Sequence, residues 1–243
     1  MEHSRRELLK TALGLGAGLL AGASVPHPAA AANGVSPLQA CQPKGDPLKH
    51  LLEGNRRFAK AWRAVAGTAD PVQRRRLYMS LLQDDCFIDP QALAFGQQPW
   101  VALLTCADSR LTPGSVFGVT PGEMFEVRSA GNTAFNTGIA SLEYAVAELK
   151  VPLIVVMGHS GCGAVKAAQA SAPLTPLLEE LVEPIRAAVQ PGDSLSEAIR
   201  RNALAAARAL PQRSAVIRDA QASNALRIQP LYFDLATGLV SLL

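Results

Sequence analysis

The chain of 243 residues carries little charge and shows no dense patch of one sign. Charged residues make up 18% and the formal net charge is +3, which is too small a surplus to indicate a nucleic-acid-binding protein. The densest basic run, Arg74 to Arg76, is interpreted as the solvated face of a helix. Polar residues are not in excess either, since 49% of the chain is hydrophobic. This composition excludes wholesale disorder and is typical of a globular protein.

The sequence also lacks an apolar run that makes a confident membrane span, which needs about 20 residues. The nearest candidate, residues 11–25, is short, weakly apolar and rich in glycine. It follows the charged residues 4–10 and precedes the small residues 29–32, which is the organisation of a signal peptide. The pair Arg5 and Arg6 resembles the twin-arginine export signal, whose machinery carries proteins that are already folded.

We therefore expect residues 1–32 to be a twin-arginine signal peptide, with Asn33 as the new N-terminus and the mature protein in the periplasm. A metal site could then be filled before export. Two alternatives stay open, namely an uncleaved membrane anchor and a lipoprotein-type cleavage before Cys41.

The mature chain has no internal repeat and no second domain boundary, which leaves one compact domain over residues 46–243. Residues 33–45 have no apolar period and are expected to form a flexible arm. Asp46 and Pro47 are typical of a helix N-terminus, and a second helix is expected over residues 71–83.

The rest of the chain alternates between short apolar runs and helical patterns. Residues 100–105, 124–127 and 153–157 are expected to be strands, and residues 137–149 and 163–170 are expected to be helices. This order predicts an α/β fold with a mainly parallel β-sheet flanked by helices. We expect a helical region over residues 174–225, broken at its four prolines, and a hairpin at the C-terminus.

Two turns that follow apolar strands carry the residues with chemical potential. The first contains Cys106, Asp108 and Arg110, and the second contains His159 and Cys162. In open parallel sheets, sites form beyond the carboxyl ends of the strands. Two cysteines and a histidine suit zinc, and three protein ligands leave the fourth tetrahedral position free for catalysis. An Asp-x-Arg pair can join through two hydrogen bonds.

Each of these signals is weak when it is taken alone. A buried cysteine is usually a small hydrophobic residue, and an Asp-x-Arg pair is usually a surface ion pair of little energetic value. From the residue types and spacing alone, a metal site and ordinary structural roles are about equally well supported.

The two motifs together resemble the signature of the β-class carbonic anhydrases. The resemblance rests on Cys106-Ala-Asp108-Ser-Arg110 and His159-Ser-Gly-Cys162-Gly163. Flanking segments extend it from about residue 46 to the C-terminus: residues 96–99, Pro113, residues 122–125, 128–132 and 141–146, Asp234, Thr237 and Gly238. Ser129 departs from the asparagine that is usual in the family.

The resemblance implies a function and a role for each matching residue. Cys106, His159 and Cys162 would bind one Zn²⁺ per chain, and Asp108 and Arg110 would be a catalytic pair. The carbon dioxide pocket would be lined by Gln97, Phe125, Ala130, Tyr144 and the backbone of Gly163. The implied reaction is the reversible hydration of carbon dioxide to bicarbonate. The implied fold has extended N-terminal helices. The implied assembly is a homodimer or a dimer of dimers that shares strands and N-terminal helices between its subunits.

Three questions stay open from the sequence. The same scaffold could hydrolyse carbon disulfide or carbonyl sulfide, or the chain could be a non-catalytic zinc-binding or redox protein. The relatives with a closed, Asp-ligated zinc are a less suitable comparison, because Leu103 and Thr105 stand where those relatives have Trp and Gly. Finally, Cys41 and Cys86 could pair in an oxidising periplasm or remain independent.

Overall fold

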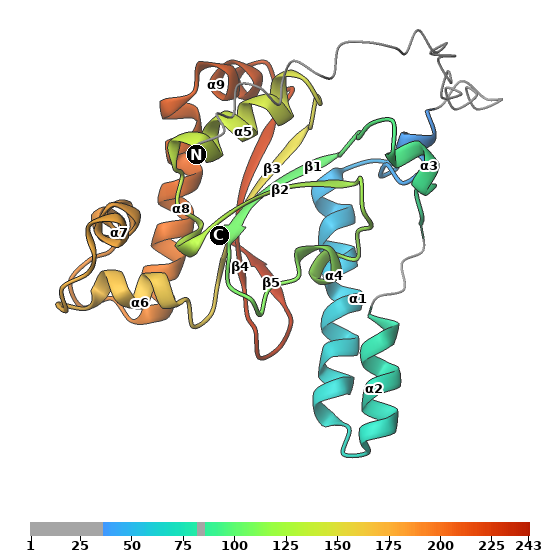
Figure 1. Ribbon diagram of the computed structural model, residues 1–243, viewed down its shortest axis with the longest axis horizontal. Helices are drawn as coiled ribbons and strands as arrows, with labels where there is room; N and C mark the ends of the chain where they lie inside the picture. The colour runs from blue at the N-terminus through green and yellow to red at the C-terminus, as the bar shows by residue number, and fades with distance from the viewer. Residues whose placement is uncertain (1–35, 82–85) are drawn as a thin grey trace, which may run out of the picture.

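The structure, a computed structural model, describes residues 36–81 and 86–243 (Figure 1). The expected signal peptide lies outside the described residues. The strands form a five-stranded sheet in the order β2-β1-β3-β4-β5. Their bounds are β1 (Val101–Cys106), β2 (Met124–Ser129), β3 (Leu153–His159), β4 (Arg227–Phe233) and β5 (Val240–Leu242). The first four strands are parallel and β5 runs antiparallel to β4, so the predicted parallel sheet and terminal hairpin are confirmed.

Both faces of the sheet are covered, which explains why its central strands are continuous apolar runs. Every residue of β1 and β3 is buried. Because successive side chains of a strand point to opposite faces, Leu103 and Val155 belong to one core cluster and Leu104 and Val156 to another. Each such buried side chain contributes about 1.5–3 kcal/mol of transfer free energy. The centre of the sheet is therefore a rigid platform for the turns at its edge.

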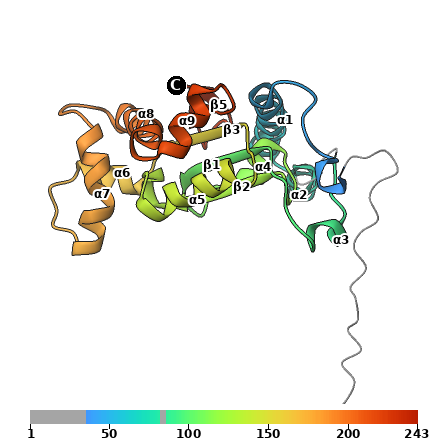
Figure 2. The same ribbon diagram turned by 90° about the horizontal axis from the view of Figure 1, so that it is seen from above.

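Helices flank the sheet on both faces, as the sequence predicts. Their bounds are α1 (Pro47–Gly67), α2 (Pro71–Ser80), α3 (Pro90–Leu93), α4 (Pro113–Phe117), α5 (Asn136–Ala147), α6 (Gly163–Gln169), α7 (Pro176–Ala188), α8 (Leu195–Arg213) and α9 (Ala215–Ala222), with short 3-10 turns η1 (Pro37–Gln39) and η2 (Ala130–Asn132). The pair α1 and α2 lies at one end of the molecule, and α6 and α7 lie at the other (Figure 1 and Figure 2). None of the helices in the described ranges combines the length and the hydropathy of a membrane span.

The helix α1 begins where predicted and is attached to the domain by buried apolar side chains and by one buried amide. Asp46 caps the helix by accepting a hydrogen bond from the N–H of residue 48. Asn55 donates to the carbonyl oxygens of Val116 and Gly238, at 3.2 and 2.9 Å, and accepts from the N–H of Val240 at 2.8 Å. One amide thus joins α1 to α4 and to the terminal hairpin.

The helix α2 extends from the domain and packs mainly on α1. None of its described side chains is buried, and it ends at Ser80, a little before the expected boundary. The basic run Arg74 to Arg76 is exposed on this helix, so its interpretation as a solvated helix face is confirmed.

The expectation that every proline of residues 174–225 breaks a helix is wrong at Pro184 and Pro211, which lie inside α7 and α8. The other two prolines do mark helix boundaries. A proline in a helix removes one backbone hydrogen bond. In α7 the carbonyl that loses its partner belongs to Glu180, an exposed residue that water can reach. Val182 and Ile185 on either side of Pro184 are fully buried, so side-chain packing holds α7 together across the proline.

Residues 36–45 are folded against the domain, which differs from the flexible arm expected over residues 33–45. Ser36 caps η1, and Cys41 forms a disulfide with Cys86. Leu38 and Ile88 belong to the small apolar cluster around this bond. Of the two alternatives for the cysteines, the structure therefore has the paired one, and the bond attaches the segment beside α3.

We expect reduction of this disulfide to lower the free energy of unfolding by about 2–4 kcal/mol, because the bond restricts the unfolded chain over a sequence separation of 45 residues. Urea unfolding with and without a phosphine reductant measures the difference. A Cys41→Ser/Cys86→Ser double variant is the control, since its unfolding should not respond to the reductant. An unchanged unfolding curve after complete reduction of the wild-type protein would contradict the prediction.

Candidate metal centre

Cys106, His159 and Cys162 meet at the carboxyl edge of the sheet. β1 and β3 are neighbours in parallel register, with Thr105 opposite Met157, so their ends bring Cys106 and His159 together. Cys162 follows in the turn that leads into α6. The ligand atoms of the three side chains all lie within 4.8 Å of one another, and the two Sγ atoms are 4.0 Å apart. All three residues are buried, as a metal group enclosed by protein requires.

The imidazole of His159 is oriented with one nitrogen satisfied and the other directed at the two sulfurs. Its Nδ1 lies 3.0 Å from the carbonyl oxygen of Ser160, which selects the tautomer with the proton on Nδ1. Its Nε2 is buried and has no hydrogen-bond partner among the described residues. A buried nitrogen without a partner is costly unless it binds a metal. The free lone pair beside two thiols therefore fits a thiophilic divalent cation such as zinc.

The pKa values of the Cys106 and Cys162 thiols are shifted in opposite directions. The hydrogen bond from Cys162, together with the one donated by the Gly131 N–H, lowers the pKa of Cys106 although burial opposes this shift. The same sulfur–sulfur hydrogen bond and burial raise the pKa of Cys162. A cation held by both sulfurs binds them as thiolates, so any proton that the pair still shares would be released on binding.

Asp108 and Arg110 form a closed ion pair beside the three ligands. Arg110 donates from Nε to Oδ1 at 2.8 Å, from Nη2 to Oδ2 at 2.6 Å and from its backbone N–H to Oδ1 at 3.0 Å. The Arg110 guanidinium holds the pKa of Asp108 well below its usual range, so the carboxyl is ionised and only accepts hydrogen bonds. Oδ2 of Asp108 lies 3.8 Å from Nε2 of His159. The carboxylate therefore borders the metal group and is held by the guanidinium.

Arg110 also joins the two turns. Its Nη2 donates to the carbonyl oxygen of Gly161 at 3.2 Å, so one side chain spans from the turn after β1 to the turn after β3.

Arg128 supports the turn after β1, and the sequence interpretation gave this residue no role. Its guanidinium donates to the carbonyl oxygens of Cys106, Asp108 and Leu111, at distances of 3.0–3.3 Å. These bonds fix the conformation of the turn that carries Cys106 and the Asp108–Arg110 ion pair. The only sequence signal for this role was the position of Arg128 at the end of an apolar run, within residues 128–132 of the family resemblance.

Gly131 is a second residue whose contribution the sequence did not show. Its N–H donates to Sγ of Cys106 at 3.2 Å. Its φ is +78°, and a Cβ at this position would lie 2.6 Å from Cδ1 of Ile185. Glycine is therefore needed for the backbone to reach the sulfur.

Two of the residues expected to line a substrate pocket lie next to the metal-binding residues. Ala130 directly follows Ser129, which is paired with Cys106 across β2 and β1. Gly163 is the first residue of α6, directly after Cys162. Ser129, which replaces the usual asparagine, shares a hydrogen bond of 3.2 Å with the hydroxyl of Thr133.

The other three expected pocket residues do not lie next to Cys106, His159 and Cys162 of the same chain. Phe125 is paired with Ala102, four residues before Cys106, and is therefore about 13 Å away along the strand. Tyr144 accompanies Phe125, with ring centroids 6.3 Å apart, and Gln97 precedes the amino end of β1. One chain therefore does not bring Gln97, Phe125 and Tyr144 to the metal-binding residues.

The fold and the site define an α/β protein with a buried Cys–His–Cys group at the carboxyl edge of a mainly parallel sheet. The family model described as carbonic anhydrase matches residues 101–240, which is more than half of the chain. The chain belongs to the carbonic anhydrase family.

Individual relatives agree with this assignment. Carbonic anhydrase 2 of Mycobacterium tuberculosis is 41% identical over 124 residues, which are 51% of this chain and 51% of that protein. The chain thus spans about half the length of the curated relatives it matches. Among solved structures, a tetrameric β-carbonic anhydrase of Sordaria macrospora has a TM-score of 0.58 at 27% identity, covering 63% of this chain and 84% of that one. The Coccomyxa β-carbonic anhydrase in complex with acetazolamide has a TM-score of 0.57 at 27% identity, covering 82% and 87%. The expected β-class fold is confirmed.

We expect Arg128→Lys to lower the free energy of unfolding by about 1–3 kcal/mol, because an ammonium group cannot reach all three carbonyl oxygens and leaves partly buried acceptors unpaired. Urea unfolding measures the change. Arg227→Lys is the matched control, since Arg227 is exposed and its nearest carboxylate, Asp46, is 3.8 Å away. Equal effects of the two substitutions would contradict the role of Arg128.

Proposed function

We propose that the protein is a zinc enzyme that catalyses the reversible hydration of carbon dioxide to bicarbonate and a proton. The observation that carries the proposal is the Cys106–His159–Cys162 group with the Asp108–Arg110 ion pair at its border. A purely structural metal site needs no such ion pair. Membership of the carbonic anhydrase family supports the same reaction.

The residues of this chain fit a single zinc ion. Cys106, His159 and Cys162 would hold it, because two sulfurs and a neutral imidazole suit zinc and leave a fourth tetrahedral position. When zinc is bound there, it supplies Lewis-acid chemistry that makes water acidic enough to react near neutral pH.

Asp108 would orient the attacking water. The ionised carboxylate accepts the water's hydrogen bond, which turns an oxygen lone pair towards carbon dioxide. Arg110 occupies both carboxylate oxygens and so keeps Asp108 beside the metal group instead of among its ligands. This arrangement favours an open site over one that Asp108 closes.

We expect Asp108→Asn to lower kcat for carbon dioxide hydration about 100-fold or more, because the amide can present its N–H groups in place of an acceptor. Stopped-flow hydration of the mature protein, with zinc content measured in parallel, tests this. Asp193→Asn is the matched control, because Asp193 pairs with Arg201 away from the site. Acetazolamide, the ligand of the Coccomyxa relative, should inhibit the wild-type protein.

The outcomes separate the candidate reactions. About one zinc per chain with fast hydration in the wild type and a loss only in Asp108→Asn supports the proposal. A zinc-loaded protein without hydration between about pH 7 and 9 would contradict it and make carbon disulfide and carbonyl sulfide the next substrates to test.

We propose that the protein is a homodimer or a dimer of dimers. Gln97, Phe125 and Tyr144 lie away from the metal-binding residues of their own chain, so they could line a pocket there only if a second copy supplied them. The Sordaria relative is tetrameric. Light scattering coupled to size exclusion should give twice or four times the chain mass. A monomer that hydrates carbon dioxide at full rate would contradict the shared pocket.

We also propose that the protein is exported folded to the periplasm. The Cys41–Cys86 disulfide supports the periplasmic location, because such bonds persist in oxidising compartments, and the arginine pair supports the export route. Replacing Arg5 and Arg6 by lysines should retain the protein in the cytoplasm, as cell fractionation would show. The same fractionation after replacing Lys44 and Lys49 by arginines is the control. Export that continues without the arginine pair would contradict the twin-arginine route.

A further inference from the structure

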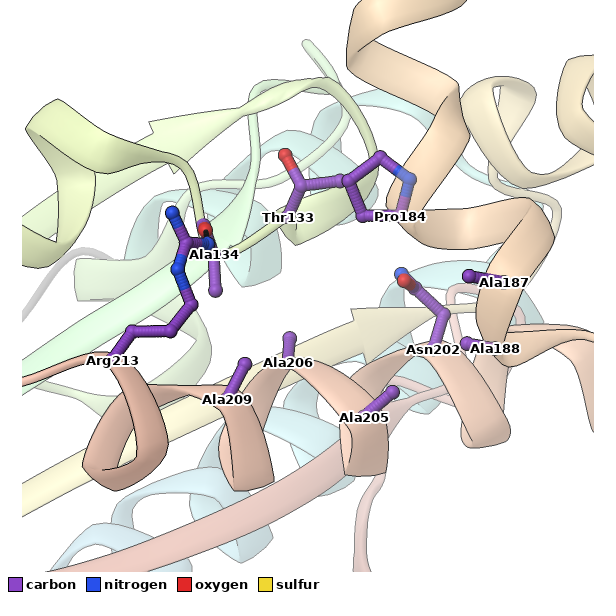
Figure 3. A pocket seen from close by; sticks show the side chains of 10 residues that line it. All are labelled: Thr133, Ala134, Pro184, Ala187, Ala188, Asn202, Ala205, Ala206, Ala209 and Arg213. Carbon is purple, nitrogen blue, oxygen red and sulfur yellow. Dashed lines mark hydrogen bonds between the residues drawn. The ribbon is translucent and has the colours of Figure 1, made fainter.

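Asn202 is a buried polar residue with no part in the chemistry described above. It lies on α8 with 2% of its surface exposed, and its amide projects into the space between α8 and α7 (Figure 3). The cavity there has a volume of about 220 Å³. Most of its lining is alanine: Ala134, Ala187, Ala188, Ala205, Ala206 and Ala209. An amide in such surroundings is costly unless it is hydrogen-bonded, so its partner is informative.

The partner is the backbone of the residue that touches Cys106. Nδ2 of Asn202 donates to the carbonyl oxygen of Gly131 at 2.7 Å, and its other contact, with Oδ1 of Asn132, is longer at 3.5 Å. The N–H of the same glycine donates to Sγ of Cys106 at 3.2 Å. A continuous path of short contacts therefore leads from α8 to the sulfur.

The backbone at Gly131 needs such a restraint. Gly131 and Asn132 have φ values of +78° and +48°, two successive residues in the left-handed region. Asparagine tolerates this region better than other non-glycine residues do, but two successive residues in it persist where the surroundings hold them. Without the bond from Asn202, the turn could relax and carry the Gly131 N–H away from the sulfur.

The helix that carries Asn202, α8, also packs against the end of β3, next to His159. A Cβ on Gly158, the residue before His159, would lie 2.9 Å from Cγ2 of Ile199 and 3.5 Å from Cβ of Ala203. α8 thus rests directly on the end of β3, and Asn202 extends from the same turn of the helix to η2. The helix sets the position of one ligand-bearing segment relative to the other.

We propose that Asn202 is a positioning residue of the metal centre, which holds the Gly131 N–H on Sγ of Cys106 and thereby keeps this sulfur aligned with His159 and Cys162. The inference rests on the proposed metal site. A hydrogen bond donated to a metal-binding sulfur both orients it and withdraws negative charge from it, and loss of such support typically weakens metal binding 10–100-fold.

The test is cobalt binding to the wild type, Asn202→Ala and Asn55→Ala. Cobalt(II) reports thiolate ligation by a charge-transfer absorption band, so it gives a readout independent of hydration activity. We expect Asn202→Ala to bind cobalt about 10-fold more weakly and to shift this band. Asn55 is the matched control, because it is equally buried and also bonds to backbone carbonyls, but between α1, α4 and the hairpin. Asn55→Ala should lose stability and keep the wild-type affinity and band.

The possible results of the cobalt experiment distinguish failure of the inference about Asn202 from failure of the proposed metal centre. An Asn202→Ala protein whose affinity and band equal those of Asn55→Ala would overturn the inference and leave the metal centre standing. A wild-type protein that binds no cobalt would overturn the metal centre and the inference with it.

If Asn202→Ala does not fold, the wild-type protein loaded with cadmium-113 decides instead. We expect scalar coupling between the metal and the Gly131 amide proton, and slow exchange of an Asn202 side-chain N–H. Absence of either signal would overturn the inference.

Discussion

The site depends first on the parallel register of β1 and β3. With Thr105 opposite Met157, both strands end at the same edge, and Cys106 and His159 become neighbours although 53 positions separate them in the chain. A slip of one residue would turn each side chain to the opposite face of the sheet. The register is fixed by the two core clusters, which need alternate residues of both strands on opposite faces. The apolar core therefore has a chemical consequence, because it places Cys106 and His159, two of the three proposed zinc ligands, side by side.

Hydrogen bonds to backbone groups hold much of the rest of the site in position. The turn after β1 is gathered by the guanidinium of Arg128, and the sulfur of Cys106 accepts the N–H of Gly131. Arg110 reaches from Asp108 to the carbonyl of Gly161 and so ties the two turns to each other. Hydrogen bonds from charged donors are stronger than neutral ones, and the bond from the Gly131 N–H to the sulfur is buried, where water competes little. These hydrogen bonds thereby hold Cys106, Asp108 and Arg110 in place within the protein itself.

The sequence predicted what periodicity and residue chemistry encode, and missed what depends on long-range proximity. Apolar runs identified the parallel strands. The Cys, His, Asp and Arg types indicated the site only together with the resemblance of the two motifs to the β-class carbonic anhydrases. Whether Cys41 meets Cys86 depends on how α1 and α2 fold back, which no local pattern encodes. Pro184 continues a helix because Val182 and Ile185 are buried, and burial is a tertiary property. The distance of Phe125 from the metal-binding residues follows from its pairing with Ala102, which became known only with the sheet register.

The central claim is that Cys106, His159 and Cys162 bind one zinc ion and leave a position open. X-ray absorption spectroscopy of the zinc-loaded protein tests it most directly. The account predicts two sulfur neighbours at about 2.3 Å and two nitrogen or oxygen neighbours at about 2.0–2.1 Å, one from the imidazole and one from solvent. The Asp108→Asn protein should give the same spectrum if the carboxylate stays off the metal. A wild-type spectrum without sulfur neighbours, or with one sulfur only, would contradict the account.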